Sequence, residues 1–106
     1  MLSTATKVDH EITINLRGGN ALAPDPMPAM KVGETVRYTS PSGKVRIVFP
    51  SSSPFPISEV NDSQIVTLAT DGEFKCRCFI TPPNGKEVGW DPDHTDSGGN
   101  HKVSKP

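Results

Sequence analysis

The sequence predicts an all-β protein that folds as a single sandwich of short strands. Apolar residues alternate with polar ones over several short stretches, which is the period of a half-buried strand. Eleven prolines and nine glycines fall within 106 residues, a density that suits many turns and argues against long helices. The length fits one domain that spans residues 1–106.

The N-terminal third contains two expected strands. Residues 10–16 alternate strictly and form the first. Residues 21–29 carry three spaced prolines, so we expect an extended edge or a loop there and not a central strand. A second strand is expected over residues 30–39, with a bend at Gly33.

The middle of the chain alternates between strands and turns. A proline and a glycine within residues 40–43 indicate a turn, and residues 44–49 alternate again as a strand. Residues 50–63 hold five serines and three prolines and are expected to be irregular. Residues 64–70 are strand-like.

The C-terminal third begins with an expected strand at residues 74–80, whose apolar residues alternate. An Asn-Gly hairpin tip then leads into a short strand at residues 86–90. Residues 91–106 are polar and glycine-rich, and we expect a loop or loose tail with at most one short pairing at 102–103. The core is therefore expected to lie within about residues 8–90.

Charge and hydropathy exclude two classes of partner. The net charge is −1, from 11 basic and 12 acidic side chains, which predicts no binding to nucleic acid or to an anionic membrane. No run approaches the roughly 18–20 apolar residues that span a bilayer. The first residues contain no apolar signal core. We expect a cytoplasmic protein if Met1 is the native start, and a periplasmic or secreted one if a leader was removed.

Three segments resemble strands of the cupredoxin family. Residues 29–38 resemble the pattern I-x-V-x-x-G-D-T-V-x-W/F, residues 44–49 resemble H-N-I-V-F, and residues 72–78 resemble G-x-Y-x-F-x-C. Their order and separation match, and the resemblance covers roughly residues 8–90. It implies a cupredoxin-like, Greek-key β-sandwich.

The resemblance does not extend to the copper site. A type 1 centre takes two imidazoles, a thiolate and usually a weak axial thioether. Cys78 stands at the thiolate position, but Val45 replaces the first histidine. Residues 79–83 contain no second histidine, and no methionine follows Met30. We therefore expect no type 1 copper, no electron transfer and no cofactor.

The chain is also similar to a group of small uncharacterised bacterial cupredoxin-like proteins that lack these ligands. This similarity is closer than the one to the copper carriers, and it implies no known activity. It is carried by residues 43–50, 53–55, 72–78, 84–85 and 91–92.

Cys76 and Cys78 are expected on the inward face of their strand. Either they pack as small apolar side chains, or they form a Cys-x-Cys pair that binds a soft ion such as Cu(I), or they take part in redox chemistry. A disulfide between them is expected to be strained, because side chains two residues apart on a strand lie roughly 6–7 Å from each other.

The polar tail supplies further potential metal ligands, His94 and His101, beside three aspartates. The aspartates depart from the EF-hand pattern because the sixth-position glycine and the closing glutamate are missing. The tail is therefore either a solvated loop or a weak surface metal site that includes one of these histidines.

Three aromatic residues, Phe55, Phe79 and Trp90, have two interpretations. They form an apolar patch that binds a partner at one end of the sandwich, or they close the open ends of a small core.

No catalytic motif is present, so we expect a protein that is not an enzyme. No Gly-x-Ser-x-Gly elbow and no phosphate-binding glycine loop occurs. The favoured hypothesis is a non-catalytic binding or structural module whose partner is a protein, a small ligand or a second copy paired through an edge strand. The alternative is a soft-metal protein that uses Cys76 and Cys78.

Overall fold

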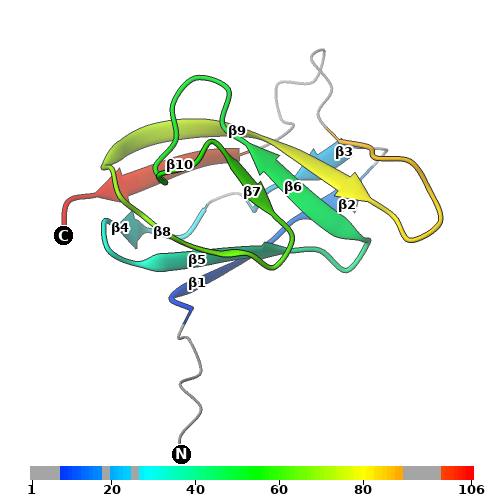
Figure 1. Cartoon of the computed structure of the whole chain (residues 1–106), viewed down its shortest axis with the longest axis horizontal. Helices are drawn as coiled ribbons and strands as arrows, with labels where there is room; N and C mark the ends of the chain where they lie inside the picture. Colours follow the sequence, from blue (N-terminus) through cyan, green and yellow to red (C-terminus); the bar gives the residue numbers. More distant parts are fainter. Residues whose placement is uncertain (1–7, 18–19, 25–26, 90–98) are drawn as a thin grey trace, which may run out of the picture.

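The protein is all-β, as the sequence predicts. The computed structural model describes residues 8–17, 20–24, 27–89 and 99–106, and within these ranges it contains strands and no helix. The strands form three sheets (Figure 1). None of the described residues belongs to a helix that could cross a membrane.

One layer is a three-stranded sheet in the order β1-β5-β8. The central strand β5 pairs in parallel with β1 and antiparallel with β8. The strands are β1 (His10–Thr13), β5 (Thr35–Thr39) and β8 (Ile65–Thr67).

The other layer is a five-stranded sheet in the order β4-β10-β9-β6-β7. Its longest member, β9, lies between β6 and β10 and is antiparallel to both. The strands are β4 (Met30–Lys31), β6 (Lys44–Val48), β7 (Glu59–Asn61), β9 (Gly72–Thr81) and β10 (Gly99–Ser104).

A small two-stranded sheet lies at one end of the molecule. It pairs β2 (Asn15–Arg17) with β3 (Asn20–Leu22) in antiparallel register. Since each strand of a two-stranded sheet is an edge strand, β3 agrees with the expectation of an extended edge or a loop over residues 21–29. The prolines that suggested a loop come later, outside β3.

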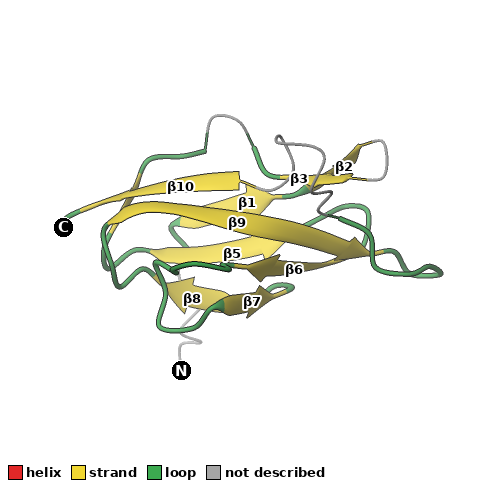
Figure 2. Cartoon of the chain, turned by 90° about the horizontal axis from the view of Figure 1, so that it is seen from above, coloured by secondary structure: helices red, strands yellow, loops and turns green. Residues whose placement is uncertain are grey.

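The core fills the space between the two larger sheets, which lie one above the other in Figure 1 and overlap in Figure 2. Inward positions alternate along each strand, as the period-two pattern predicts, and they bury one continuous apolar cluster. Tyr38, Ile47 and Cys78 are fully buried at its centre. This arrangement is consistent with the predicted β-sandwich.

The strand expected over residues 30–39 is divided between the two layers. Met30 pairs with Val103 in the five-stranded sheet, whereas residues 35–39 form the middle of the three-stranded sheet. Gly33 lies at the crossing with a φ of +97°, a conformation that favours glycine. The predicted bend is thus a change of sheet.

The expectation of a loose tail is wrong for residues 99–104. They form β10, which pairs with β9 on one side and with β4 on the other. His101 and Val103 point into the core and are buried. The core therefore extends beyond residue 90. The short strand expected at residues 86–90 is reduced, in its described part, to one bridge between Val88 and Ile80.

Candidate functional site

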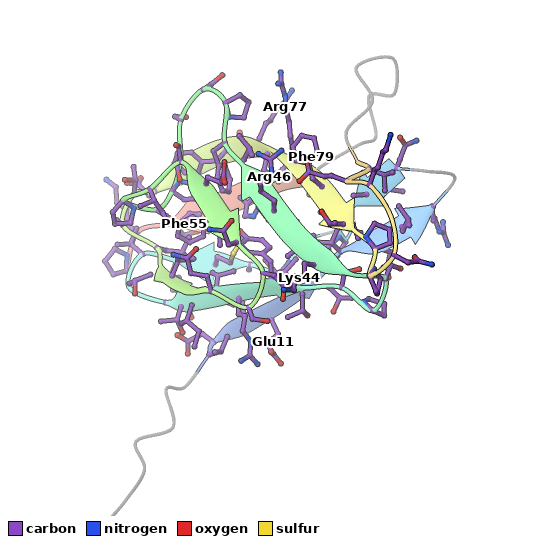
Figure 3. The ribbon with its side chains drawn as sticks, turned by 45° about the vertical axis from the view of Figure 1, so that its right-hand side comes forward. Glu11, Lys44, Arg46, Phe55, Arg77 and Phe79 are labelled. Carbon is purple, nitrogen blue, oxygen red and sulfur yellow. The ribbon has the colours of Figure 1, made fainter. Side chains whose placement is uncertain are left out.

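The outer face of the five-stranded sheet carries a stacked pair, Arg46 on Phe79. The two residues are direct partners across β6 and β9. Since their neighbours Ile47 and Cys78 face the core, the alternation of the strands places both side chains outward (Figure 3). The guanidinium carbon lies 4.4 Å from the centre of the Phe79 ring, a cation–π distance.

Arg46 also forms ion pairs with two carboxylates from other parts of the chain. Its Nε and Nη2 donate to Glu87 at 3.0 and 2.8 Å, and its Nη1 donates to Glu59 at 3.3 Å. Glu87 follows β9, and Glu59 begins β7. The hydrogen bonds that Arg46 donates to Glu87 lower the pKa of Glu87 and raise the pKa of Arg46. Both side chains are more than a third exposed, so we expect at most a few tenths of a kcal/mol from this pair.

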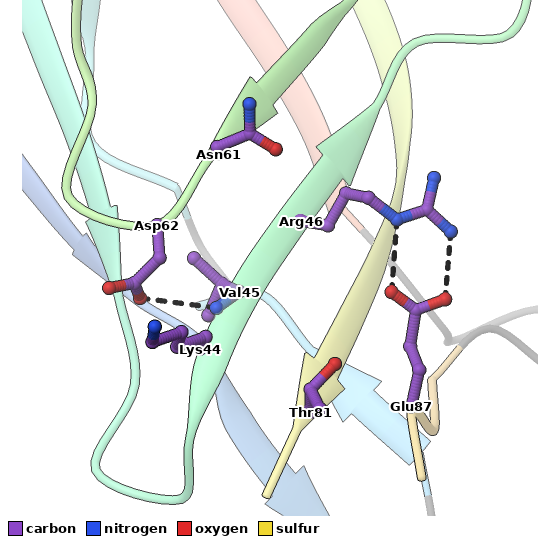
Figure 4. Close-up of a pocket in the computed structure, with 7 residues that line it drawn as sticks. All are labelled: Lys44, Val45, Arg46, Asn61, Asp62, Thr81 and Glu87. Carbon is purple, nitrogen blue, oxygen red and sulfur yellow. Dashed lines mark hydrogen bonds and ion pairs between the residues drawn. The ribbon is translucent and has the colours of Figure 1, made fainter. Parts of the chain in front are cut away.

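A groove of about 400 Å³ runs beside this cluster. Arg46 and Glu87 lie along one side of it and Asp62 and Lys44 along the other (Figure 4). All the lining residues except Val45 have polar or charged side chains; they are Lys44, Val45, Arg46, Asn61, Asp62, Thr81 and Glu87.

The polar groups of the groove divide into two classes. Arg46 and Glu87 bind each other, and Asp62 accepts hydrogen bonds from the Val45 amide and the Ser63 hydroxyl, each at 3.1 Å. The side chains of Lys44, Asn61 and Thr81 are exposed and have no such partner among the described residues. The groove therefore offers an ammonium, an amide and a hydroxyl to a ligand. Sequence reasoning missed this site because Glu87 and Asp62 reach it only through the folding of two loops.

A second polar cluster lies inside the core. The Tyr38 hydroxyl and the Nε2 of His101 are 2.7 Å apart, and His101 is completely buried. The rings of Phe49 and Phe55 pack around the pair. The Nδ1 of His101 has no hydrogen-bond partner among the described residues. His101 is thus part of the core and not the exposed ligand that the tail suggested.

Replacing Tyr38 with phenylalanine tests this buried hydrogen bond. We expect Tyr38→Phe to lower the free energy of unfolding by about 1–3 kcal/mol, since the His101 imidazole then loses its remaining hydrogen-bond partner. Urea denaturation measures the loss. The double variant Tyr38→Phe/His101→Leu is the control: removing both polar partners is expected to cost less than removing Tyr38 alone. A larger loss in the double variant would contradict this account.

Cys76 and Cys78 lie on the inward face, as predicted, and both are buried and free. Their Sγ atoms are 3.8 Å apart, closer than the roughly 6–7 Å expected from strand geometry, because the two side chains turn toward each other. The hydrogen bond between the Cys78 and Cys76 thiols, together with burial, raises the pKa of Cys78 well above its ordinary value of 9.0. Burial, with a smaller contribution from the nearby thiols, also raises the pKa of Tyr38 well above 10.0.

These raised pKa values predict a loss of stability in alkali. The unfolded chain releases the Cys78 and Tyr38 protons near their ordinary pKa values, whereas the folded protein holds them. Stability is therefore complete below about pH 8.5 and falls above it, by up to about 1.4 kcal/mol per pH unit for each group that has begun to titrate. Urea unfolding between pH 7.5 and 10.5 measures the slope. The Cys78→Ala variant should have a shallower slope between pH 9 and 10, and an equal slope would exclude Cys78 as its source.

The predicted metal ligands do not converge within the described residues. No three side chains of histidine, cysteine, aspartate or glutamate lie close enough to hold one ion in that part of the chain. Cys76 and Cys78 form a pair, and the Nε2 of His101 is engaged by Tyr38. His94 lies outside the described residues.

The predicted aromatic patch does not form as proposed. Phe55 is 4% exposed and packs against Tyr38 and Phe49, so it closes the core and cannot contact a partner. Its loop folds back because the carbonyl of Pro54 accepts hydrogen bonds from the amides of residues 69 and 70. Phe79 lies on the outer face beneath Arg46. Trp90 is outside the described residues.

Comparisons with protein-family models, with curated proteins and with solved structures find no match to this chain.

Proposed function

We propose that this protein is a non-catalytic binding module that recognises an acidic, extended segment of a partner protein in the groove across β6 and β9. One observation carries the proposal. Lys44 offers an ammonium without a charge partner in the described structure, beside the side chains of Asn61 and Thr81, in a groove where Arg46 and Glu87 form an ion pair and Asp62 is hydrogen-bonded to the Val45 amide and the Ser63 hydroxyl.

The lining favours a polar chain segment over a small apolar molecule. Sites for small molecules are mainly apolar and enclose most of their ligand. This groove has one apolar lining residue, Val45, and lies on the open face of a sheet (Figure 4). An extended segment can place a carboxylate near Lys44 while its other polar groups meet the amide of Asn61 and the hydroxyl of Thr81.

The placement of hydroxyl and imidazole groups supports a role without catalysis. The Tyr38–His101 pair is closed off from substrate by burial. The other described histidine, His10, is bound to Glu34 at 2.9 Å, an ion-pair geometry. Neither histidine is hydrogen-bonded to a serine, threonine or cysteine nucleophile in the described part of the chain.

We further propose that the sandwich is of the cupredoxin-like, Greek-key type without type 1 copper. The three segments that resemble the family lie on β4 and β5, on β6, and on β9, and the last two are neighbours in one sheet. Val45 and Cys78, at the positions of two copper ligands, face the core from these neighbouring strands. Adding copper to the reduced protein should give no intense blue absorption band. Such a band with stoichiometric copper would refute the proposed absence of a type 1 copper site.

Peptide titration followed by amide chemical shifts tests the binding proposal. A hexapeptide of alternating glutamate and serine should shift the amides of Lys44, Asn61 and Thr81, whereas its lysine–serine counterpart should not. Lys44→Gln should weaken binding about two- to fivefold, the effect of one exposed ion pair. Lys102→Gln, which removes a charge from β10 of the same sheet, is the matched control. Shifts centred on β10, or no saturable shifts, would refute the proposal.

A second candidate function is the binding of a soft metal ion by Cys76 and Cys78. Two thiolates bound tetrahedrally to one ion at about 2.3 Å are roughly 3.8 Å apart, and the two Sγ atoms already have this separation. Thiolates favour ions such as Cu(I) and Zn²⁺. Reduced protein titrated with Cu(I) against a competing chelator should take up one equivalent, and a Cys76→Ala/Cys78→Ala variant should take up none. Equal uptake by the two proteins would refute this candidate.

A further inference from the structure

The edges of the two larger sheets differ in how they are protected. In the five-stranded sheet, β4 has only two residues, and the Asn61 amide and carbonyl of β7 are both bound by Gln64, at 3.0 and 3.1 Å. In the three-stranded sheet, β1 carries Glu11, which forms an ion pair with Arg37. Short length, charge and local capping are the usual means by which natural proteins block edge strands.

The fourth edge, β8, is also short, at three residues, but it carries no charge, and the loop that hydrogen-bonds beside it, through the Pro54 carbonyl, reaches only the amides of residues 69 and 70 beyond its end. Residues 63–70 contain no charged side chain, and Ile65 is one of two large apolar side chains that are exposed in the described structure, at 38%. The strand lies at the margin of its sheet (Figure 2). Two copies of this segment can therefore approach without repulsion between like charges.

The hydrogen-bond pattern leaves backbone groups of β8 without partners. In an antiparallel pair, alternate residues direct both the N–H and the C=O toward the same neighbour. The Leu68 amide donates to the Glu34 carbonyl at 2.9 Å, so Val66, two residues earlier, also faces β5. Ile65 and Thr67 consequently point their amides and carbonyls away from the sheet, and these groups have no partner among the described residues.

From this pattern we infer that β8 is a self-association edge that pairs antiparallel with β8 of a second copy of this chain. A two-fold axis at Val66 places Ile65 of one copy opposite Thr67 of the other. Each of these two pairs then exchanges two N–H···O=C bonds, so all the outward groups of Ile65 and Thr67 are satisfied at once. The side chain of Ile65 comes to lie beside that of Thr67 of the other copy.

The same geometry limits the strength of the dimer. Three residues from each copy bury far less than the roughly 1,200–2,000 Å² of a stable interface. The association should therefore be weak, and the protein should be monomeric in dilute solution and increasingly dimeric as its concentration rises toward the millimolar range. This inference is independent of the groove on the other sheet.

Hydrogen exchange of the unmodified protein tests the edge directly. The Ile65 and Thr67 amides should exchange rapidly in dilute solution and more slowly as concentration rises, by about twofold where half the chains are dimeric, because only the monomer exchanges. The Val66 amide should be protected throughout. Sedimentation over the same range should show the average mass rising toward that of a dimer. A constant monomer mass at 1 mM would overturn the inference, as would concentration-dependent protection at β1 or β7 in place of β8.

Two variants locate the contact, with one matched control. Ile65→Lys places a charge at the edge, and Thr67→Pro removes an outward N–H without adding charge; both should abolish the rise in mass. Thr13→Lys adds the same charge at the opposite edge of the same sheet and should leave the rise unchanged. A dimer that persists in both β8 variants, or that only Thr13→Lys abolishes, would overturn the inference.

Discussion

Removal of residues 99–106 is expected to unfold the protein. These residues supply β10, which lies between β4 and β9 in the five-stranded sheet. Without β10, β9 loses its hydrogen-bonding partner over residues 72–76, and β4 loses the strand on which it pairs. The deletion also removes the buried side chains of His101 and Val103 and opens the core to water. A domain with about 5–15 kcal/mol of stability does not tolerate the loss of an internal strand.

Circular dichroism and thermal unfolding measure this effect. The shortened chain should show no cooperative transition, whereas deletion of only Lys105 and Pro106, which are exposed and lie beyond β10, should change the midpoint by no more than a few degrees. A cooperative transition within a few degrees of the full chain in the longer deletion would show that β10 is dispensable.

The sequence did not reveal β10, for a physical reason. Its residues are Gly99–Ser104, and glycine and asparagine have low strand propensity. Only Val103 is an apolar residue on the inward side, because His101, the other inward residue, is counted as polar. The burial of the His101 imidazole depends on its hydrogen bond with the hydroxyl of Tyr38, which lies 63 residues earlier in the chain. Local pattern cannot detect a strand whose inward face is completed by such a distant partner.

Where the period-two pattern is strong, prediction and structure agree. Residues 44–48 and 72–81 are strands, and the inward positions of Cys76 and Cys78 are confirmed. The all-β class follows from the same pattern. The division of residues 30–39 between two sheets was not predictable, since a strand that bends and a strand that changes sheet present the same alternation.

The groove was beyond sequence reasoning for a different reason. Arg46 is recognisable as an outward residue between two buried ones, but many surface arginines share that pattern. What distinguishes it is its contact with Glu87, 41 residues later, and with Phe79 on the neighbouring strand. Phe55 shows the converse case: an aromatic residue on a serine- and proline-rich loop suggested an exposed patch, yet the loop folds back and buries the ring.

Substitution of Gly43 by alanine is expected to be the most damaging single change among the described glycines of the turns. Gly43 ends the turn before β6 and has a φ of +156°. An added Cβ would overlap the Thr81 carbonyl oxygen and lie 2.7 Å from the carbonyl carbon and 2.9 Å from the Cα of Pro82. These are backbone atoms at the end of β9, so the clash can be relieved only by separating the turn from the sheet.

Two other glycines separate the contributions to this effect. At Gly33 the backbone has a φ that is unfavourable for alanine, but nothing lies within 4 Å of an added Cβ. We therefore expect Gly33→Ala to lower the free energy of unfolding by about 1–2 kcal/mol. Gly85→Ala meets only ordinary contacts with Pro82 and should stay within about 0.5 kcal/mol of the unsubstituted protein. Gly43→Ala combines the backbone strain with the overlap and should cost about 3 kcal/mol or more in urea denaturation. If Gly43→Ala costs no more than Gly33→Ala, the turn moves freely against β9, and the close approach of residues 43 and 81 is not needed to stabilise the sheet.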